Sequence, residues 1–311
     1  MKLNLKKITA LALAASMVFS TAAFADEIKT GEESAAEQSQ QSEEEVSDDI
    51  IGEEAAEIKP WSDYFVISHA CGAVDGRVET NSLEAFEQNY EKGQRVFEMD
   101  FILTLDNKLV ARHDFEQNSY YVMEQTYNKK IPVMMHQMFI NMPINYKYTP
   151  MDIDMVVEQL NNHKDAYIVT DSKNTDKETI EKEFQLMKEA VERTGNDEIF
   201  DRIVVQIYYP EMQEYIRNIG GFKNFMLTTY QIQNPDFNEL AEFCVKNDIG
   251  AVVVPFEALT EKKAEVIHNA GLKLYTHTLN RLYDVKKCID MYGIDGVYSD
   301  YLVESDIDYI K

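Results

Sequence analysis

Short runs of β-branched and aromatic residues alternate along this chain with longer amphipathic segments, and this alternation limits its possible folds more than any other feature. The runs expected to form strands cover residues 64–68, 96–103, 167–170, 203–207, 225–229, 251–254, 273–276 and 296–299. Helix-like segments lie between them, and this order predicts a parallel sheet. Eight such runs after residue 59 match the size of a closed TIM-type (β/α)8 barrel. A doubly wound open sheet is the alternative, although no Gly-x-Gly-x-x-Gly sequence follows the first run.

The first 59 residues differ in composition from the rest of the chain. Three lysines precede an apolar run over residues 8–19, and small residues at positions 23 and 25 predict an export signal that is cleaved after Ala25. A retained membrane anchor is the alternative, but the run is shorter than the ~20 residues that a spanning helix needs. Residues 26–59 are acidic and contain no aromatic residue, which predicts a disordered linker. We therefore expect residues 60–311 to form the barrel domain of an exported protein that is secreted, wall-associated or periplasmic.

Charge and cysteine content exclude several classes of protein. The formal net charge is -25 at pH 7, and every large section after the signal is acidic, so neither duplex nucleic acid nor an anionic lipid surface is an expected partner. The three cysteines are an odd number and do not lie at zinc-ligand spacing, so we expect neither a disulfide framework nor a zinc site. No stable membrane span is expected after signal cleavage, and the sequence leaves the oligomeric state open.

Polar side chains gather at the ends of the expected strands, where the active site of an eight-stranded barrel lies. These residues are His69, Glu98, Asp100, His113, Asp171, Lys173 and His277. Residues two apart share one face of a strand, so Glu98 and Asp100 point the same way. Neighbouring carboxylates repel unless a cation lies between them, and hard oxygen ligands suit Mg²⁺ or Ca²⁺. The strand ends therefore predict a site for one divalent cation.

The segment between Asp100 and His113 is too short for a parallel crossover. Asp106 and Asn107 fit a two-residue hairpin turn, and that turn places Asp100 directly opposite His113. A slip of one residue would turn His113 to the other face of the hairpin. This register predicts that a histidine returns to the carboxylate pair.

Four segments in the first part of the barrel carry this chemistry in a fixed order: Ser68-His69-Ala70-Cys71-Gly72, Thr80-Asn81-Ser82-Leu83-Glu84-Ala85-Phe86, Gly93-Gln94-Arg95-Val96-Phe97-Glu98-Met99-Asp100 and Leu109-Val110-Ala111-Arg112-His113-Asp114. Together they resemble the glycerophosphodiester phosphodiesterase family, one of the phospholipase C-like phosphodiesterase barrels. That family has His-Arg-Gly, Glu-Asn-Thr-Leu-x-x-Phe, Glu-x-Asp and His-Asp at these places. Weaker similarities extend the resemblance over about residues 63–303.

The resemblance implies a role for each matching residue. The implied acid/base pair is His69 and His113, the implied ligands of one Ca²⁺ or Mg²⁺ ion are Glu98, Asp100 and Asp171, and the implied phosphate partner is Lys173. The implied reaction is the hydrolysis of glycerophosphodiesters to glycerol 3-phosphate and an alcohol, so the expected partner is a small phosphodiester or a phospholipid headgroup.

Several residues depart from the family pattern. Ala70 replaces an arginine, and Arg77 is the candidate to replace it as a substrate-binding residue. Thr80 stands where the family has glutamate. Asp171 is one methylene shorter than the usual glutamate, which is similar to the sphingomyelinase D branch. His277 replaces a tryptophan near the mouth and is a further candidate to bind substrate. A lipid-directed phosphodiesterase is therefore one alternative, and a catalytically silent barrel that binds wall polymer or lipid headgroups is another.

Residues 115–148 form an insertion after the His113-Asp114 end that is rich in tyrosine, phenylalanine and methionine. Such adaptable side chains suit a lid over a lipid or headgroup. A cap packed on the barrel is an equal alternative.

Overall fold

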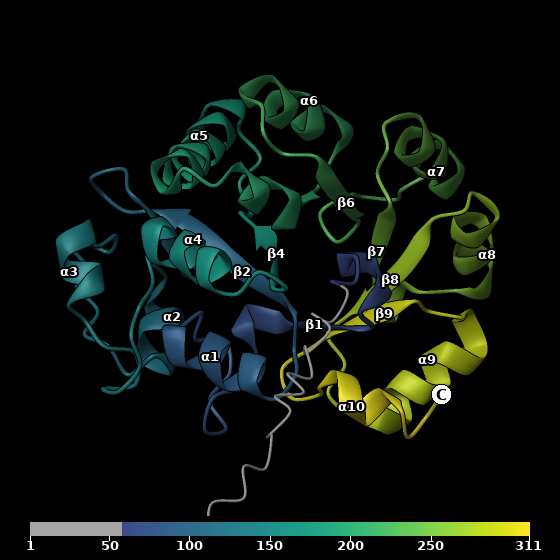
Figure 1. The fold of residues 1–311 in the computed structure, drawn as a ribbon, viewed down its shortest axis with the longest axis horizontal. Helices are drawn as coiled ribbons and strands as arrows, with labels where there is room; N and C mark the ends of the chain where they lie inside the picture. Colours follow the sequence, from purple (N-terminus) through teal and green to yellow (C-terminus); the bar gives the residue numbers. More distant parts are fainter. Residues whose placement is uncertain (1–57) are drawn as a thin grey trace, which may run out of the picture. The chain divides into compact units, whose positions relative to one another are not determined.

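Eight parallel strands close on themselves in the computed structural model, which describes residues 58–311 (Figure 1). The sheet order is β1-β9-β8-β7-β6-β5-β4-β2-β3, and a further pairing of β1 with β2 closes the barrel and leaves the antiparallel β3 outside it. The strands are β1 (Val66–Ser68), β2 (Val96–Leu103), β3 (Leu109–Ala111), β4 (Tyr167–Asp171), β5 (Ile203–Ile207), β6 (Asn224–Thr228), β7 (Ala251–Pro255), β8 (Lys273–His277) and β9 (Gly296–Ser299). The predicted TIM-type barrel is confirmed, and the open sheet is wrong because β1 pairs on both sides.

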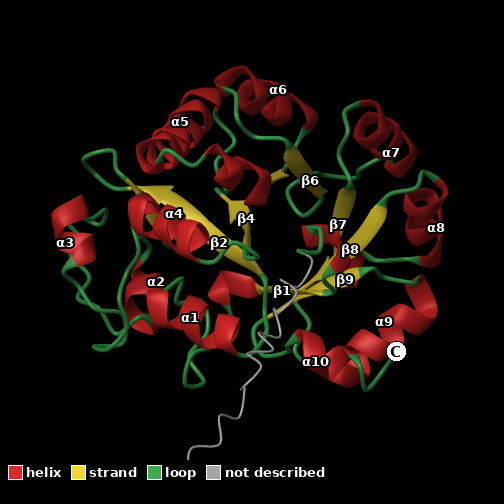
Figure 2. Cartoon of the chain, viewed as in Figure 1, coloured by secondary structure: helices red, strands yellow, loops and turns green. Residues whose placement is uncertain are grey.

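Helices surround the barrel as an outer ring (Figure 2). They are α1 (Leu83–Glu91), α2 (Gln117–Val122), α3 (His136–Ile140), α4 (Ile153–Asn162), α5 (Lys177–Thr194), α6 (Pro210–Ile219), α7 (Phe237–Lys246), α8 (Glu261–Asn269), α9 (Leu282–Tyr292) and α10 (Glu304–Ile307). Side-chain caps and a proline determine the residues at which several of these helices begin. Ser82 and Asp176 accept backbone amide hydrogen bonds as N-caps of α1 and α5, and Pro210 opens α6 at a position where its missing N–H costs nothing.

Apolar side chains fill much of the barrel interior. Val96, Val169, Met226 and Val253 belong to one buried cluster inside the ring of strands. Gly296 in β9 leaves room for the ring of Tyr275, because a Cβ at this glycine would lie 2.2 Å from that ring. With this part of the interior filled, the expected place for a site is the carboxyl ends of the strands, as in other barrels of this type.

The hairpin of β2 and β3 corrects the predicted register. Phe101 pairs with Ala111, so Asp100 lies opposite Arg112 and the pairing is shifted by one residue from the prediction. The reason is the turn, in which the backbone amide of Thr104 bonds to the carbonyl of Lys108 and Asn107 takes a left-handed φ of 58°. The strand ends at Ala111, and the chain beyond it reaches the mouth of the barrel by an irregular path.

The insertion is a small structure packed on this hairpin. It holds α2 and α3, and Phe115, Tyr120, Met134 and Phe139 form a buried cluster with Val110 of β3. No residue of 115–148 is among those that line the pocket described below, which favours the cap over the lid.

Other predictions concern residues away from the site. The predicted export signal and nearly all of the predicted linker lie outside the described residues. Among the described helices none is long and apolar enough to cross a membrane. All three cysteines are buried and free, in agreement with the absence of a disulfide framework.

Candidate active site

The residues predicted at the strand ends meet around one pocket at the mouth of the barrel. The pocket has a volume of about 460 Å³ and is lined by His69, Glu98, His113, Asp171, Lys173, Gln206, Thr228, Tyr230, Gln231, Pro255, His277 and Tyr298. Asp100 lies just behind the lining and is hydrogen-bonded to Lys173. The structure therefore brings together seven of the eight predicted site residues, and Arg77 is the exception.

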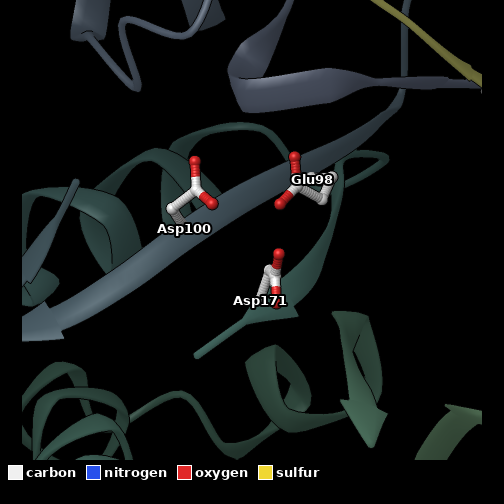
Figure 3. A group of neighbouring side chains, drawn as sticks. All are labelled: Glu98, Asp100 and Asp171. Carbon is white, nitrogen blue, oxygen red and sulfur yellow. The ribbon is translucent and has the colours of Figure 1, made fainter. Parts of the chain in front are cut away.

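Three carboxylates form the acidic centre of the pocket (Figure 3). Glu98 and Asp100 lie on one face of β2, and the register of β2 with β4 places Asp171 beside Asp100. One oxygen of each carboxylate lies within 4.8 Å of the others, and the three residues are 2%, 1% and 8% exposed. All three can therefore reach a single ion.

Neutral side chains hold two of these carboxylates in place. Asn81 donates from its amide to Asp100 Oδ2 at 2.8 Å, and its carbonyl accepts the backbone amide of Asp100 at 3.0 Å. The hydroxyl of Tyr208 donates to Asp171. Neither Asn81 nor Tyr208 was predicted to be a site residue. Asn81 lies in a motif that resembles the family, so a signal existed, whereas nothing in the sequence around Tyr208 indicated this contact.

Lys173 lies between the carboxylates. Its ammonium group donates to Asp100 and lies 3.5 Å from Asp171 Oδ2. The residue takes a left-handed φ of 55°, and its backbone amide donates to the hydroxyl of Tyr208 at 2.8 Å. Burial opposes its charged form, but Asp100, Asp171 and Glu98 together raise the pKa of Lys173 above its ordinary value. The lysine is therefore charged at any physiological pH.

Three carboxylates share this centre with the ammonium group of Lys173. Burial and the charge of Asp100 raise the pKa of Glu98, and burial raises that of Asp171. Burial also opposes ionisation of Asp100, but Lys173 and further partners hold its pKa below the ordinary value. A buried group of oxygen ligands whose charged forms are disfavoured by burial and mutual repulsion fits a hard divalent cation such as Ca²⁺ or Mg²⁺, which would stabilise those charged forms.

His69 belongs to a chain of hydrogen bonds that continues through Asp300 to Asn280. Its Nδ1 lies 2.7 Å from Asp300 Oδ1, and Asn280 donates to Asp300 Oδ2 at 2.6 Å. Burial opposes the charged imidazole, but the bond to Asp300 and the charge of Glu98 raise the pKa of His69 to about 9. Asp300 therefore fixes the ring orientation and stabilises its protonated form.

His113 is more exposed than His69 and has its own carboxylate partner. Its Nδ1 lies 2.6 Å from Asp114 Oδ2, and its side chain is 43% exposed. Arg112 anchors the chain below it by donating to the carbonyl of Asp114 at 2.5 Å and to Gln125 at 2.8 Å. His113 thus reaches the pocket despite the shifted register, because the chain has already left the strand.

Ala70, which stands in place of the family's arginine, and Arg77, the candidate to replace that arginine, have different environments in the structure. Ala70 takes a left-handed φ of 46°, and its backbone amide donates to Glu98 Oε2 at 2.8 Å, so this position supports the acidic centre through its main chain. Arg77 is exposed and pairs with Glu124 of the insertion at 2.8 Å. A tight turn between Val74 and Arg77 directs the guanidinium there, so Arg77 does not take the place of the missing arginine in the pocket.

Solved structures of low sequence identity share the fold. A phosphodiesterase from Oleispira antarctica, in complex with the product sn-glycerol-3-phosphate, is 14% identical with a TM-score of 0.63, over 79% of this chain and 96% of that chain. A glycerophosphodiester phosphodiesterase from Parabacteroides distasonis is 14% identical with a TM-score of 0.61, over 80% and 96%. The enzyme from Thermotoga maritima is 19% identical with a TM-score of 0.57, over 79% and 98%.

Sequence comparison assigns the family directly. No curated protein matches the chain. The model of the glycerophosphoryl diester phosphodiesterase family matches residues 73–304, which include the acidic centre, His113, Lys173 and His277. This chain therefore belongs to the glycerophosphoryl diester phosphodiesterase family.

Proposed function

We propose that this protein hydrolyses glycerophosphodiesters to glycerol 3-phosphate and an alcohol, with the help of one divalent cation. The observation that carries the proposal is the meeting of three buried carboxylates, two histidines and a lysine around one pocket. Membership of the family supports the same reaction. Glu98, Asp100 and Asp171 are the proposed ligands of the cation, which is Ca²⁺ or Mg²⁺.

The side chains of this pocket suit phosphodiester cleavage. A bound cation supplies positive charge for the phosphoryl oxygens. Lys173 adds a second positive charge at the same place and needs no change of protonation to do so. His69 and His113 line the pocket as the proposed acid/base pair: one imidazole accepts the proton of the attacking hydroxyl, and the other donates a proton to the departing alcohol.

Phosphorus NMR of the full chain tests this function. The protein is incubated with glycerophosphocholine and, separately, with lysophosphatidylcholine micelles, each with Ca²⁺, with Mg²⁺ or with EDTA. We expect cation-dependent release of glycerol 3-phosphate from the soluble diester. Turnover of the micelles alone would replace this proposal with the lipid-directed alternative, and silence in every sample would favour the catalytically silent barrel.

We also propose export, because the first 25 residues have the composition of a signal peptide. Sequencing of the mature N-terminus from the producing cell tests it. A start at Asp26 is expected, and an intact N-terminus at Met1 would contradict the proposal.

A further inference from the structure

Arg112 is a buried arginine that follows directly on strand β3, and it is 4% exposed. Its guanidinium donates to the carbonyl of Asp114 at 2.5 Å, to Gln125 Oε1 at 2.8 Å and to Ser119 Oγ at 3.1 Å. Burial lowers the pKa of Arg112 to about 10, so the group is still charged at physiological pH. Among the described residues none of its hydrogen-bond partners is a carboxylate, although buried charges are usually paired. Such an arginine calls for a reason beyond packing.

Every hydrogen-bond partner of this guanidinium comes from residues 114–125, which include the start of the insertion. The group also lies over the rings of Phe115 and Tyr120, with its carbon 5.1 and 4.7 Å from the ring centroids. Gln125 extends the connection, since its amide donates to the carbonyl of Met142 at 2.9 Å. The guanidinium therefore joins both the early and the late part of the insertion to the barrel.

His113 lies between two points that Arg112 fixes. On one side, the backbone amide of Arg112 donates to the carbonyl of Asp100 at 3.0 Å and ties the chain to β2. On the other side, the guanidinium holds the carbonyl of Asp114, whose carboxylate lies 2.6 Å from His113 Nδ1. Within residues 58–311 the imidazole has no other hydrogen bond, and the side chain is 43% exposed. The position of this ring therefore depends on how the segment 112–114 is held.

We propose that Arg112 is a positioning residue for His113, and that the insertion acts through Arg112 to hold this imidazole at the pocket. The inference rests on the proposed function, because it needs His113 to take part in proton transfer. Loss of the guanidinium frees the backbone beside Asp114, the one hydrogen-bond partner of the ring among the described residues. An acid or base must lie within hydrogen-bond reach of the atom that it serves, so a small displacement lowers the rate. The insertion thus supports the reaction without lining the pocket.

A second buried arginine provides a matched control. Arg202 is 7% exposed and also donates to backbone carbonyls, those of Leu160 at 2.5 Å and His163 at 3.0 Å, but it lies at the amino end of β5, away from the pocket. Arg112→Met and Arg202→Met each remove a buried guanidinium from the full chain. With glycerophosphocholine and Ca²⁺, we expect kcat to fall about tenfold in Arg112→Met with KM unchanged. Both parameters are expected to stay unchanged in Arg202→Met, at a temperature where circular dichroism shows both variants folded.

A double-mutant cycle with His113 separates positioning from a general loss of stability. His113→Ala alone is expected to lower kcat about 100-fold. Arg112→Met added to His113→Ala is expected to cause no further loss, because no imidazole is left to position. A further tenfold loss in the double variant, or an unchanged kcat in Arg112→Met alone, would overturn the inference. Full activity of His113→Ala would instead overturn the proposed role of His113, and the inference with it.

A milder substitution keeps the inference testable if Arg112→Met does not fold. Gln125→Leu removes one of the three partners of the guanidinium, and Gln137→Leu on the exposed face of α3 is its control within the insertion. We expect kcat to fall about threefold in Gln125→Leu with KM unchanged, and no further loss when it is added to His113→Ala. In that case a kcat equal to that of Gln137→Leu would overturn the inference.

Discussion

The two sides of the pocket pair their polar atoms differently. The carboxylate wall consists of His69, Glu98, His113, Asp171 and Lys173, with Asp100 just behind them, and the neutral wall consists of Gln206, Thr228, Tyr230, Gln231, Pro255, His277 and Tyr298. On the carboxylate wall, Asp100 is held by Asn81 and Lys173, and His69 is held by Asp300. On the neutral wall, Thr228 and His277 each have a buried polar atom without a partner. Groups that stabilise developing charge work best when they are already oriented, since no reorganisation is then needed during the reaction. Groups that recognise a ligand gain most when only the correct ligand satisfies them.

This difference predicts that substitutions on the carboxylate wall change the reaction rate, whereas those on the neutral wall change discrimination between substrates. The largest effect is expected for Glu98→Gln, which keeps the size of the side chain and removes one charge from the cation site. We expect kcat/KM for glycerophosphocholine to fall by about 100-fold or more, with a weaker affinity for Ca²⁺ in calorimetry. Glu91→Gln, at the exposed end of α1, is the control. Full activity of Glu98→Gln would remove the assigned ligand set.

A smaller effect is expected for Asp300→Asn. The amide keeps a hydrogen-bonding group beside His69 Nδ1 but removes the charge that supports the protonated ring. We expect kcat to fall by about 10- to 100-fold with little change in KM, because the substitution alters proton transfer and not binding. Steady-state kinetics beside Asp290→Asn on the surface of α9 checks this. A change confined to KM would show that Asp300 acts on substrate binding instead.

The smallest effect on activity is expected for a substitution of Glu183. This residue also has a buried polar atom without a partner, but it does not line the pocket. Glu183 of α5 is 1% exposed, accepts a bond from Asn174 at 2.7 Å, and leaves Oε2 without a partner. Burial raises its pKa to about 9. The unfolded chain loses this proton near pH 4.5 and the folded chain only near pH 9, so the free energy of unfolding falls as pH rises between these values.

Glu183→Gln removes this titration. We expect the variant to be more stable than the natural protein by about 1–3 kcal/mol at pH 8, with a difference that shrinks toward pH 5. Calorimetric melting at pH 5, 6.5 and 8 measures it, with Glu181→Gln on the same helix as the control. A gain in stability that does not depend on pH would contradict the account of Glu183.

Elements with strong local signals were predictable from the sequence. The apolar runs 96–103 and 203–207 form β2 and β5 with the expected bounds. The helices α2 and α3 were not predicted, because they have six and five residues and no side-chain cap. The hairpin register was wrong because it depended on the backbone angle of a single residue, Asn107, in the turn.

The site residues that lie at the ends of strands could be predicted from the sequence. Glu98, Asp100 and Asp171 meet because parallel strands in register bring their ends together. Partners from distant parts of the chain, such as Tyr208 for Asp171, depend on the packing of loops that no local pattern encodes. The unpartnered atoms of the neutral wall are a property of three-dimensional packing alone, and therefore only the structure reveals them.

A crystal structure of the full chain with Mn²⁺ and glycerol 3-phosphate tests most directly which residues bind the cation and the phosphate. Anomalous scattering locates the metal, and the electron density locates the ligand. The account predicts Mn²⁺ bound by Glu98, Asp100 and Asp171, and the phosphate beside Lys173. A metal bound away from these carboxylates, or a phosphate bound away from Lys173, would contradict it.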